Sequence, residues 1–216
     1  MTQSDKPDSA GNEERAEHKA AQLHSLGWET GAGATIWARA VSDELGRHES
    51  ARESFGAKAN REAWERLHST ALMVVVAIDQ VLTFEDRVRR LTGDAELARA
   101  RARFDAVGPR AGALRDLVVH LDDYAVGTGH RQTGQAGPLI TDPYVETFLY
   151  WTNDGGTVLD LAGESLNLRT AARAAVELAE VVERVRAEYL ERAEQEANEA
   201  LRRRYGLDPP TSSSDS

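Results

Sequence analysis

The sequence predicts a mainly all-α fold: a helical bundle of four to five helices with one small β-hairpin and a long C-terminal helix. Three observations lead to this prediction. Apolar residues recur at steps of three and four over most of the chain, one stretch alternates with the two-residue period of a strand, and glycine or proline separates the segments. With 216 residues, the chain is long enough to bury a core of its own.

Two long helices are expected in the first half of the chain. The first covers residues 35–45, and the second covers residues 61–91, where apolar side chains occupy much of the circumference at about 100° per residue. The core stripe of the second helix consists of Trp64, Leu67, Ala71, Leu72, Val75, Ile78 and Leu82, flanked by Val74, Val81 and Val88. We therefore expect the second helix in the middle of the bundle.

Shorter elements follow. Helices are expected over residues 95–104 and 110–126, with a Gly-Pro break between them. A small β-hairpin is expected near residues 157–168, because leucines alternate with polar or small residues on both sides of a turn.

The chain is expected to end in a long helix over residues 169–205. Its apolar positions recur every three or four residues up to Tyr189 and continue only as alanines and one leucine, so the first half should pack and the second half project. The acidic tail 1–22 and the tail 207–216 are expected to be disordered, because few apolar side chains offset the cost of ordering them. Residues 23–206 are expected to form a single domain.

Composition excludes several functions. The chain has no cysteine, which excludes a disulfide framework, a thiolate nucleophile and cysteine-ligated metals. The first 22 residues lack the apolar core of a secretory signal, and the longest apolar run, residues 71–78, is too short to span a bilayer. We therefore expect a cytoplasmic protein without membrane contact, and the net charge of −10 argues against nonspecific DNA binding.

The histidines and glycines form no familiar metal or phosphate motif. No His-Glu-x-x-His, Glu-x-x-His or EF-hand pattern accompanies the six histidines, so no metal and no cofactor are expected. His24, His48 and His68 are expected on polar or boundary faces. The segment from Gly31 to Thr35 lacks the lysine and the spacing of a phosphate loop and is expected to be a helix entry loop.

The segment 110–126 has one clear core face. With Leu114 placed at 0°, Leu117, Val118, Leu121 and Ala125 lie within about 60° of it. The residues on the other side are Arg115, Asp116, Val119, His120 and Asp123. An apolar valine among charged residues indicates a second interface on this side of the helix.

Arg115 and His120 form an Arg/His motif with four residues between them and a polar residue directly after the arginine. This motif resembles that of the HEPN (higher eukaryote and prokaryote nucleotide-binding) superfamily, and the resemblance covers about residues 61–129. Asp122 stands where many members have a tyrosine, and Tyr124 follows two residues later. The resemblance implies a metal-independent endoribonuclease of a bacterial toxin or phage-defence type, with its active site shared across a homodimer.

The resemblance also implies a role for each residue. His120 would transfer a proton at the 2′-hydroxyl or the leaving oxygen, Arg115 would clamp the phosphate, and Asp116 would orient the imidazole. Because Arg115 and His120 lie about 140° apart around a helix and about 7.5 Å along it, two copies crossing at Val119 are expected to build the site. The residues expected to contact RNA are Arg110, Tyr124 and Arg131. A cognate antitoxin or another protein is a further expected partner.

The charge pattern agrees with this site, but other functions remain open. Residues 87–131 hold nine arginines against six acids, although the whole chain is acidic. The alternative is a noncatalytic helical protein–protein interaction module that uses the projecting C-terminal helix. A third possibility is a ligand-binding regulator with a pocket lined by Trp37, Trp64 or Trp151.

Overall fold

Helices make up most of the described structure, which confirms the mainly all-α fold class. The computed structural model describes residues 33–120, 147–153 and 155–205, together with five isolated positions between residues 15 and 25. The elements in these ranges are α2 (Ala34–Ala57), α3 (Arg61–Thr92), α4 (Ala95–Val107), α5 (Ala111–Val119), β1 (Thr147–Trp151), β2 (Thr157–Leu161), β3 (Glu164–Asn167) and α8 (Leu168–Tyr205).

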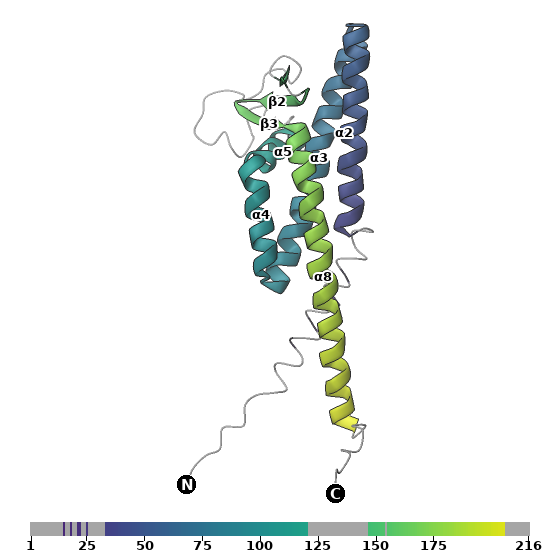
Figure 1. Ribbon diagram of the computed structural model, residues 1–216, viewed down its shortest axis with the longest axis vertical. Helices are drawn as coiled ribbons and strands as arrows, with labels where there is room; N and C mark the ends of the chain where they lie inside the picture. The colour runs from purple at the N-terminus through teal and green to yellow at the C-terminus, as the bar shows by residue number, and fades with distance from the viewer. Residues whose placement is uncertain are drawn as a thin grey trace, which may run out of the picture.

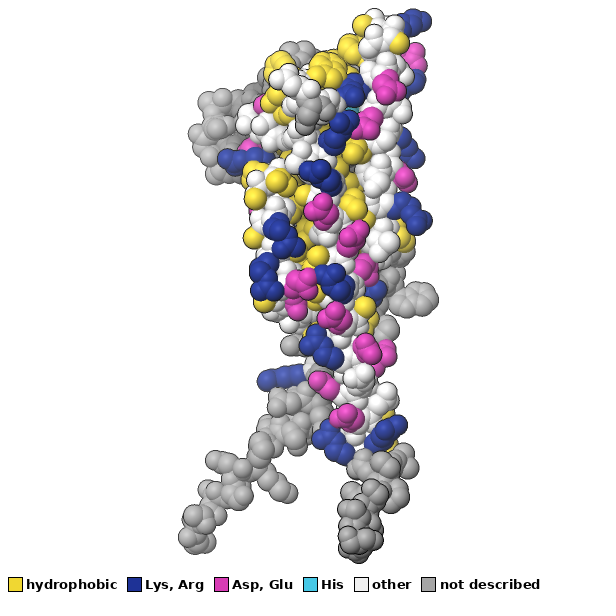
Figure 2. All heavy atoms as spheres, in the orientation of Figure 1, with side chains coloured by type: hydrophobic (Ala, Val, Ile, Leu, Met, Phe, Trp, Pro, Cys, Tyr) yellow, Lys and Arg dark blue, Asp and Glu magenta, His cyan; other side chains and the backbone are white. Residues whose placement is uncertain are grey.

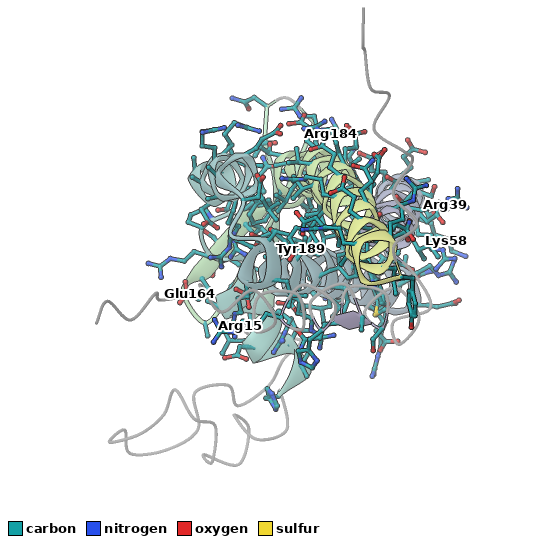
Figure 3. The ribbon with its side chains drawn as sticks, turned by 90° about the horizontal axis from the view of Figure 1, so that it is seen from below. Arg15, Arg39, Lys58, Glu164, Arg184 and Tyr189 are labelled. Atoms are coloured by element: carbon teal, nitrogen blue, oxygen red, sulfur yellow. The ribbon has the colours of Figure 1, made fainter. Side chains whose placement is uncertain are left out.

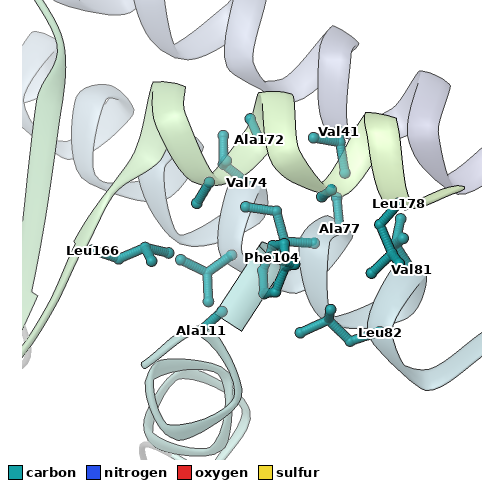
Figure 4. Packing of buried hydrophobic residues seen from close by; sticks show 14 of the residues in the cluster. Val41, Val74, Ala77, Val81, Leu82, Phe104, Ala111, Leu166, Ala172 and Leu178 are labelled. Carbon is teal, nitrogen blue, oxygen red and sulfur yellow. The ribbon is translucent and has the colours of Figure 1, made fainter. Parts of the chain in front are cut away.

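The bundle is built around three long helices. α2, α3 and α8 pack lengthwise against one another, α4 packs on α8, and the short α5 packs on α3 (Figure 1). Their buried side chains form one apolar cluster, in which Phe104 of α4 lies among residues of α3 and α8 (Figure 4). Seen along the bundle axis, Arg184 lies on the side of α8 that faces α4 and forms an ion pair with Glu96 (Figure 3).

α3 is the central helix, as the apolar side chains around much of its circumference predict. Val74, Val75 and Ile78 have no solvent exposure, and neither have Leu67 and Val81. By length and composition alone α3 could cross a membrane, since an 18-residue window in it is apolar enough; 61% of that window is buried inside the protein. This burial is what the core helix of a bundle requires.

Local signals explain where α3 begins and ends. The Asn60 side chain accepts a hydrogen bond from the Ala63 backbone N–H at 2.8 Å, which caps the first turn. Gly93 ends the helix in the left-handed conformation, with a φ of 64°. Asp94 then caps α4 by accepting hydrogen bonds from the backbone N–H groups of Glu96 and Leu97.

The sheet is antiparallel, with the strand order β1-β2-β3. Leu149, Leu159 and Leu166 lie in register across the three strands and are buried, so one face of the sheet packs against the helices. The hairpin turn between β2 and β3 contains Ala162 and Gly163, both with positive φ, as a tight type I′ connection needs. The predicted hairpin is therefore present, with one additional strand.

Four element predictions differ from the structure. The third helix continues from residue 104 to Val107. The first helix continues from residue 45 to Ala57, because its inward positions after Leu45 are His48 and Ala51, which an apolar pattern does not reveal. The strand β1 was not predicted; in its sequence, TFLYW, Leu149 is buried, whereas Phe148, Tyr150 and Trp151 are exposed. The fourth helix ends at Val119 rather than at residue 126. The tails expected to be disordered and the segment 121–146 lie outside the described residues, apart from the isolated positions near the N-terminus.

Candidate functional site

α5 carries the Arg/His motif, and its orientation agrees with the sequence pattern. Leu114 and Leu117 are fully buried against the bundle. Val119 is 53% exposed, so the predicted apolar residue does stand on the outer surface. α5 is nine residues long and is held mainly by its contact with α3.

Arg115 is anchored to its own chain. Its Nε donates to Asp79 Oδ2 of α3 at 2.8 Å, and its Nη1 donates to Asp116 Oδ1 at 3.2 Å. The hydrogen bond to Asp79 raises the pKa of Arg115. Asp79 is only 6% exposed, and the Arg115 side chain keeps 32% of its surface in solvent. Two carboxylates thus partly neutralise the group that was expected to clamp a phosphate.

His120 lies at the end of α5, not within a continuing helix. It is the C-cap residue, and its backbone N–H donates to the Asp116 carbonyl oxygen at 3.1 Å. Leu121, Asp123 and Ala125, which were expected on this helix, lie outside the described residues. Tyr124 and Arg131, two of the three expected RNA contacts, lie outside the described residues.

Arg110, the third expected RNA contact, connects α5 to the sheet. Its Nε lies 3.2 Å from Glu164 Oε2 at the start of β3, although 60% of its side chain remains exposed. This ion pair gives Arg110 a partner within the chain, so contact with RNA would have to compete with Glu164.

The basic excess of residues 87–131 is compensated in three dimensions. The arginines of this range that are paired with acids are Arg89, Arg90, Arg101, Arg110 and Arg115. Several of their partners, including Asp79, Glu85 and Glu164, lie outside the counted range. The count along the chain therefore overstates the positive potential of this surface.

Glu85 is the most deeply buried charged residue in the part of the chain that the structure describes, and the sequence pattern did not single it out. It has no exposure, accepts from Arg89 Nε at 2.9 Å, and accepts from Arg101 Nη1 of α4 at 2.8 Å. Burial works to lower the pKa of Arg101, but its hydrogen bonds to Asp105 and Glu85 outweigh burial and raise it. A signal was available, since Glu85 follows Ile78 by seven residues and so lies on the core face of α3.

His48 and His68 are buried, which corrects the expectation that they lie on polar or boundary faces. His48 is 1% exposed and His68 is 2% exposed, between α2 and α3. His48 Nδ1 lies 3.3 Å from Thr70 Oγ1, whereas its Nε2 is buried without a hydrogen-bond partner. Burial lowers the pKa of His48 to about 4, so the ring is neutral at pH 7.

Two of the three tryptophans proposed as pocket walls take part in a packed aromatic cluster. The Trp64 ring lies 5.3 Å from the Phe55 ring and 4.0 Å from the His68 ring. Phe55 also stacks on Trp151 of β1, with ring centroids 6.5 Å apart. These contacts join the sheet to the C-terminal end of α2 and the N-terminal end of α3, so the rings have a structural role. Trp37 is partly buried against the core.

Within the described ranges, no group of three or more histidine and acidic side chains is arranged to hold a metal ion. Comparison with known proteins adds no functional assignment. No family model, no curated protein and no solved structure matches this chain.

Proposed function

We propose that this chain is a noncatalytic helical interaction protein that associates with a second copy of itself through the distal part of α8, residues 188–205. The observation that carries this proposal is that α8 extends well beyond the bundle (Figure 1). Among the described side chains of α8, Ala193 is the last that is buried, while Leu201 is 46% and Tyr205 is 65% exposed. Helical stability in proteins comes mostly from packing of an apolar face, and an antiparallel copy would supply that packing.

The distal part of α8 has a narrow apolar stripe. With Ala197 at 0°, Leu190, Ala193, Ala200 and Leu201 lie within about 60° of it, and Glu194 and Arg204 are the charged positions in the same range. Ala197 and Ala200 are half-buried, and Leu201 is exposed. The small side chains would allow a second helix to approach closely.

The charge distribution selects a second copy in antiparallel orientation. Five glutamates lie between residues 188 and 199, whereas three consecutive arginines follow at residues 202–204. Figure 2 shows acidic and basic side chains along the exposed face of this helix down to its end. In an antiparallel pair centred on Ala197, Leu201 faces Ala193 of the partner subunit, and the arginine-rich end, residues 202–204, lies level with residues 190–192 of the partner subunit, close to the partner's Glu188 and the partner's Glu191. A parallel pair would place like charges side by side.

Charge reversal tests this arrangement. Arg203→Glu and Glu191→Arg should each weaken dimerisation by roughly tenfold, because each brings like charges to the same level of the symmetric dimer twice. The double variant should restore it. The matched control is Arg66→Glu on α3, whose exposed partner Glu62 is on the same helix. Sedimentation velocity over a range of concentrations measures the monomer–dimer equilibrium.

A deletion separates association from folding. A chain that ends at Gln195 should remain monomeric and keep the melting temperature of the monomeric bundle, because the last buried side chain, Ala193, is retained. A full-length chain that stays monomeric at its highest soluble concentration would overturn the proposal. So would a dimer that survives both the deletion and Leu201→Asp.

A second candidate is the HEPN-like endoribonuclease. The observation that favours it is the exposure of Val119 between Arg115 and His120, because an apolar residue there could join two copies of α5. Asp79 would then act as the group that holds Arg115 in a fixed orientation. The same ion pair counts against strong phosphate binding, so we place this candidate second.

RNA cleavage in EDTA tests the second candidate. His120→Asn is the main variant, because Arg115→Ala also removes the partner of the buried Asp79. Cleavage by the wild type that disappears in His120→Asn and in Val119→Asp would favour the nuclease. If His120→Asn cleaves RNA as fast as the wild type, or if no RNA is cleaved, the nuclease candidate is excluded.

A further inference from the structure

A pocket lies between α4 and the first turns of α8, on the side of α4 that faces α8. Its cavity volume is about 330 Å³, at the lower end of the size of ligand sites. Its apolar wall consists of Ala100, Phe104, Val107, Ala174 and Leu178. Phe104 and Leu178 belong to the core, so this wall is held rigidly. Hydrophobic atoms are visible between α4 and α8 in Figure 2.

The rim of the pocket is polar and mostly basic. Arg103 of α4 and Arg173 of α8 line it, together with Thr170 and Glu177. Both arginines are exposed and come from different helices. They converge on one cavity because α4 packs along α8.

Unlike Arg101 and Arg169, the two rim arginines form no ion pair with the described residues. Arg101, on the other side of α4, is held by Glu85 and Asp105, and Arg169, one turn before Arg173, is held by Glu49. No carboxylate of the described ranges lies within ion-pair distance of Arg103 or Arg173. The rim thus carries two guanidinium groups against one carboxylate, Glu177, which leaves a local excess of positive charge in a chain of net charge −10.

We propose that this pocket binds a small organic anion, a carboxylate or phosphate monoester on a short aliphatic or aromatic body. Arg103 and Arg173 bind the anionic group from two sides, and the Thr170 hydroxyl provides a further hydrogen bond. Arginine suits this role because its planar fork matches both carboxylate and phosphate oxygens. The body of the ligand covers Val107, which is 41% exposed, and the wall beside Ala174. This proposal does not depend on self-association through α8.

Isothermal titration with four probes tests the site. Phenyl phosphate and hexanoate carry both an anionic group and an apolar body, whereas inorganic phosphate has only the anion and benzyl alcohol only the body. We expect the first two probes to bind at least about tenfold more tightly than the last two, because only they use both parts of the pocket. The comparison of phenyl phosphate with hexanoate shows which anionic group is preferred.

Variants connect binding to the pocket. Arg103→Gln and Arg173→Gln should each weaken binding of the preferred probe by about tenfold, the loss expected for one charge-assisted hydrogen-bonded contact. Ala174→Leu should weaken binding of the probe, because the larger side chain fills part of the cavity while both arginines stay in place. The matched control is Arg99→Gln, an exposed arginine one turn before Arg103 that does not line the pocket. Circular dichroism confirms that each variant folds.

The proposal fails if neither phenyl phosphate nor hexanoate binds at millimolar concentration. It also fails if binding is unchanged in Arg103→Gln and Arg173→Gln, or if Arg99→Gln weakens binding equally. Equal affinity for phenyl phosphate and inorganic phosphate, unaffected by Ala174→Leu, would indicate general attraction of anions to surface arginines and would overturn the site.

Discussion

Arg115 belongs both to a motif typical of a nuclease and to an ion pair within the bundle. Its spacing from His120 matches a nuclease motif, yet its guanidinium forms an ion pair with Asp79, a carboxylate 36 residues earlier in the chain. A buried carboxylate needs a compensating charge, because its transfer from water to the protein interior is costly. Arg115 therefore has a structural function whether or not it also contacts RNA.

Replacing Arg115 tests this structural function. Arg115→Ala should lower the free energy of unfolding by about 2 kcal/mol, because it leaves the buried Asp79 carboxylate without its ion-pair partner. Urea denaturation measures the change. Arg66→Ala, which removes an exposed pair with Glu62, is the control and should cost less than about 0.5 kcal/mol. Equal losses in the two variants would contradict the assignment.

His48 makes stability depend on pH. Its pKa is about 4 in the folded state against 6.5 when unfolded, so the unfolded chain binds more protons between these values. Stability from this group is complete above pH 6.5 and is lost as the pH falls toward 4, by about 3 kcal/mol in total. The charged or titratable groups near it are Arg52 and Glu49 of α2 and His68 of α3.

The glutamine of His48→Gln does not titrate between pH 4 and 6.5, so this variant should show a weaker dependence of stability on pH. Urea denaturation at pH 7, 6, 5 and 4 compares the two proteins. Parallel curves for wild type and His48→Gln would show that other groups cause the loss.

At the scale of elements, the periodic patterns were informative wherever they were continuous. α3 begins at Arg61 as predicted and ends one residue beyond its predicted end. The apolar side chains around its circumference, the asparagine cap before it and the glycine after it all indicate the same bounds. The hairpin and the start of α8 are also where the sequence predicts them. The second half of α2 was missed because its inward face includes His48. β1 was missed because its edge position leaves Phe148, Tyr150 and Trp151 exposed, so no buried stripe marks it.

The hairpin turn offers a test at this scale. Ala162 has a φ of 51° and Gly163 a φ of 79°, a region that costs an alanine roughly 1 kcal/mol or more. Ala162→Gly removes the steric cost but makes the unfolded chain more flexible, so we expect a small increase in the free energy of unfolding. Gly163→Ala should lower the free energy of unfolding by about 1 kcal/mol. Thermal unfolding measures both. A loss in Ala162→Gly as large as that in Gly163→Ala would contradict this account of the turn.

The whole molecule combines a rigid bundle with an unsupported helical extension. The core cluster runs through α2, α3, α4, α5, the sheet and the first half of α8. Beyond Ala193, α8 has few contacts with the described bundle, as Figure 1 shows. Stability should therefore be unequal along one continuous helix.

Hydrogen exchange should reveal this inequality. Amides of residues 74–82 in α3 and 171–182 in α8 should exchange slowest, because their side chains fill the core. Amides of residues 194–205 should exchange fast in dilute protein and become protected as the concentration rises, if the second copy covers them. Protection of 194–205 that does not change with concentration would contradict the dimer.

The sequence by itself determined the helical class, the central position of α3, the hairpin and the extent of α8, because these depend on periodicity and on local caps and turns. The tertiary structure alone decided the partners of the charged side chains. Asp79 holds Arg115, Glu85 holds Arg101, and Glu164 holds Arg110, each pair joining different elements. Periodicity assigns a residue to a face of its own helix, but an ion pair depends on which faces meet, and only the packed bundle sets that. The pocket between α4 and α8 exists for the same reason.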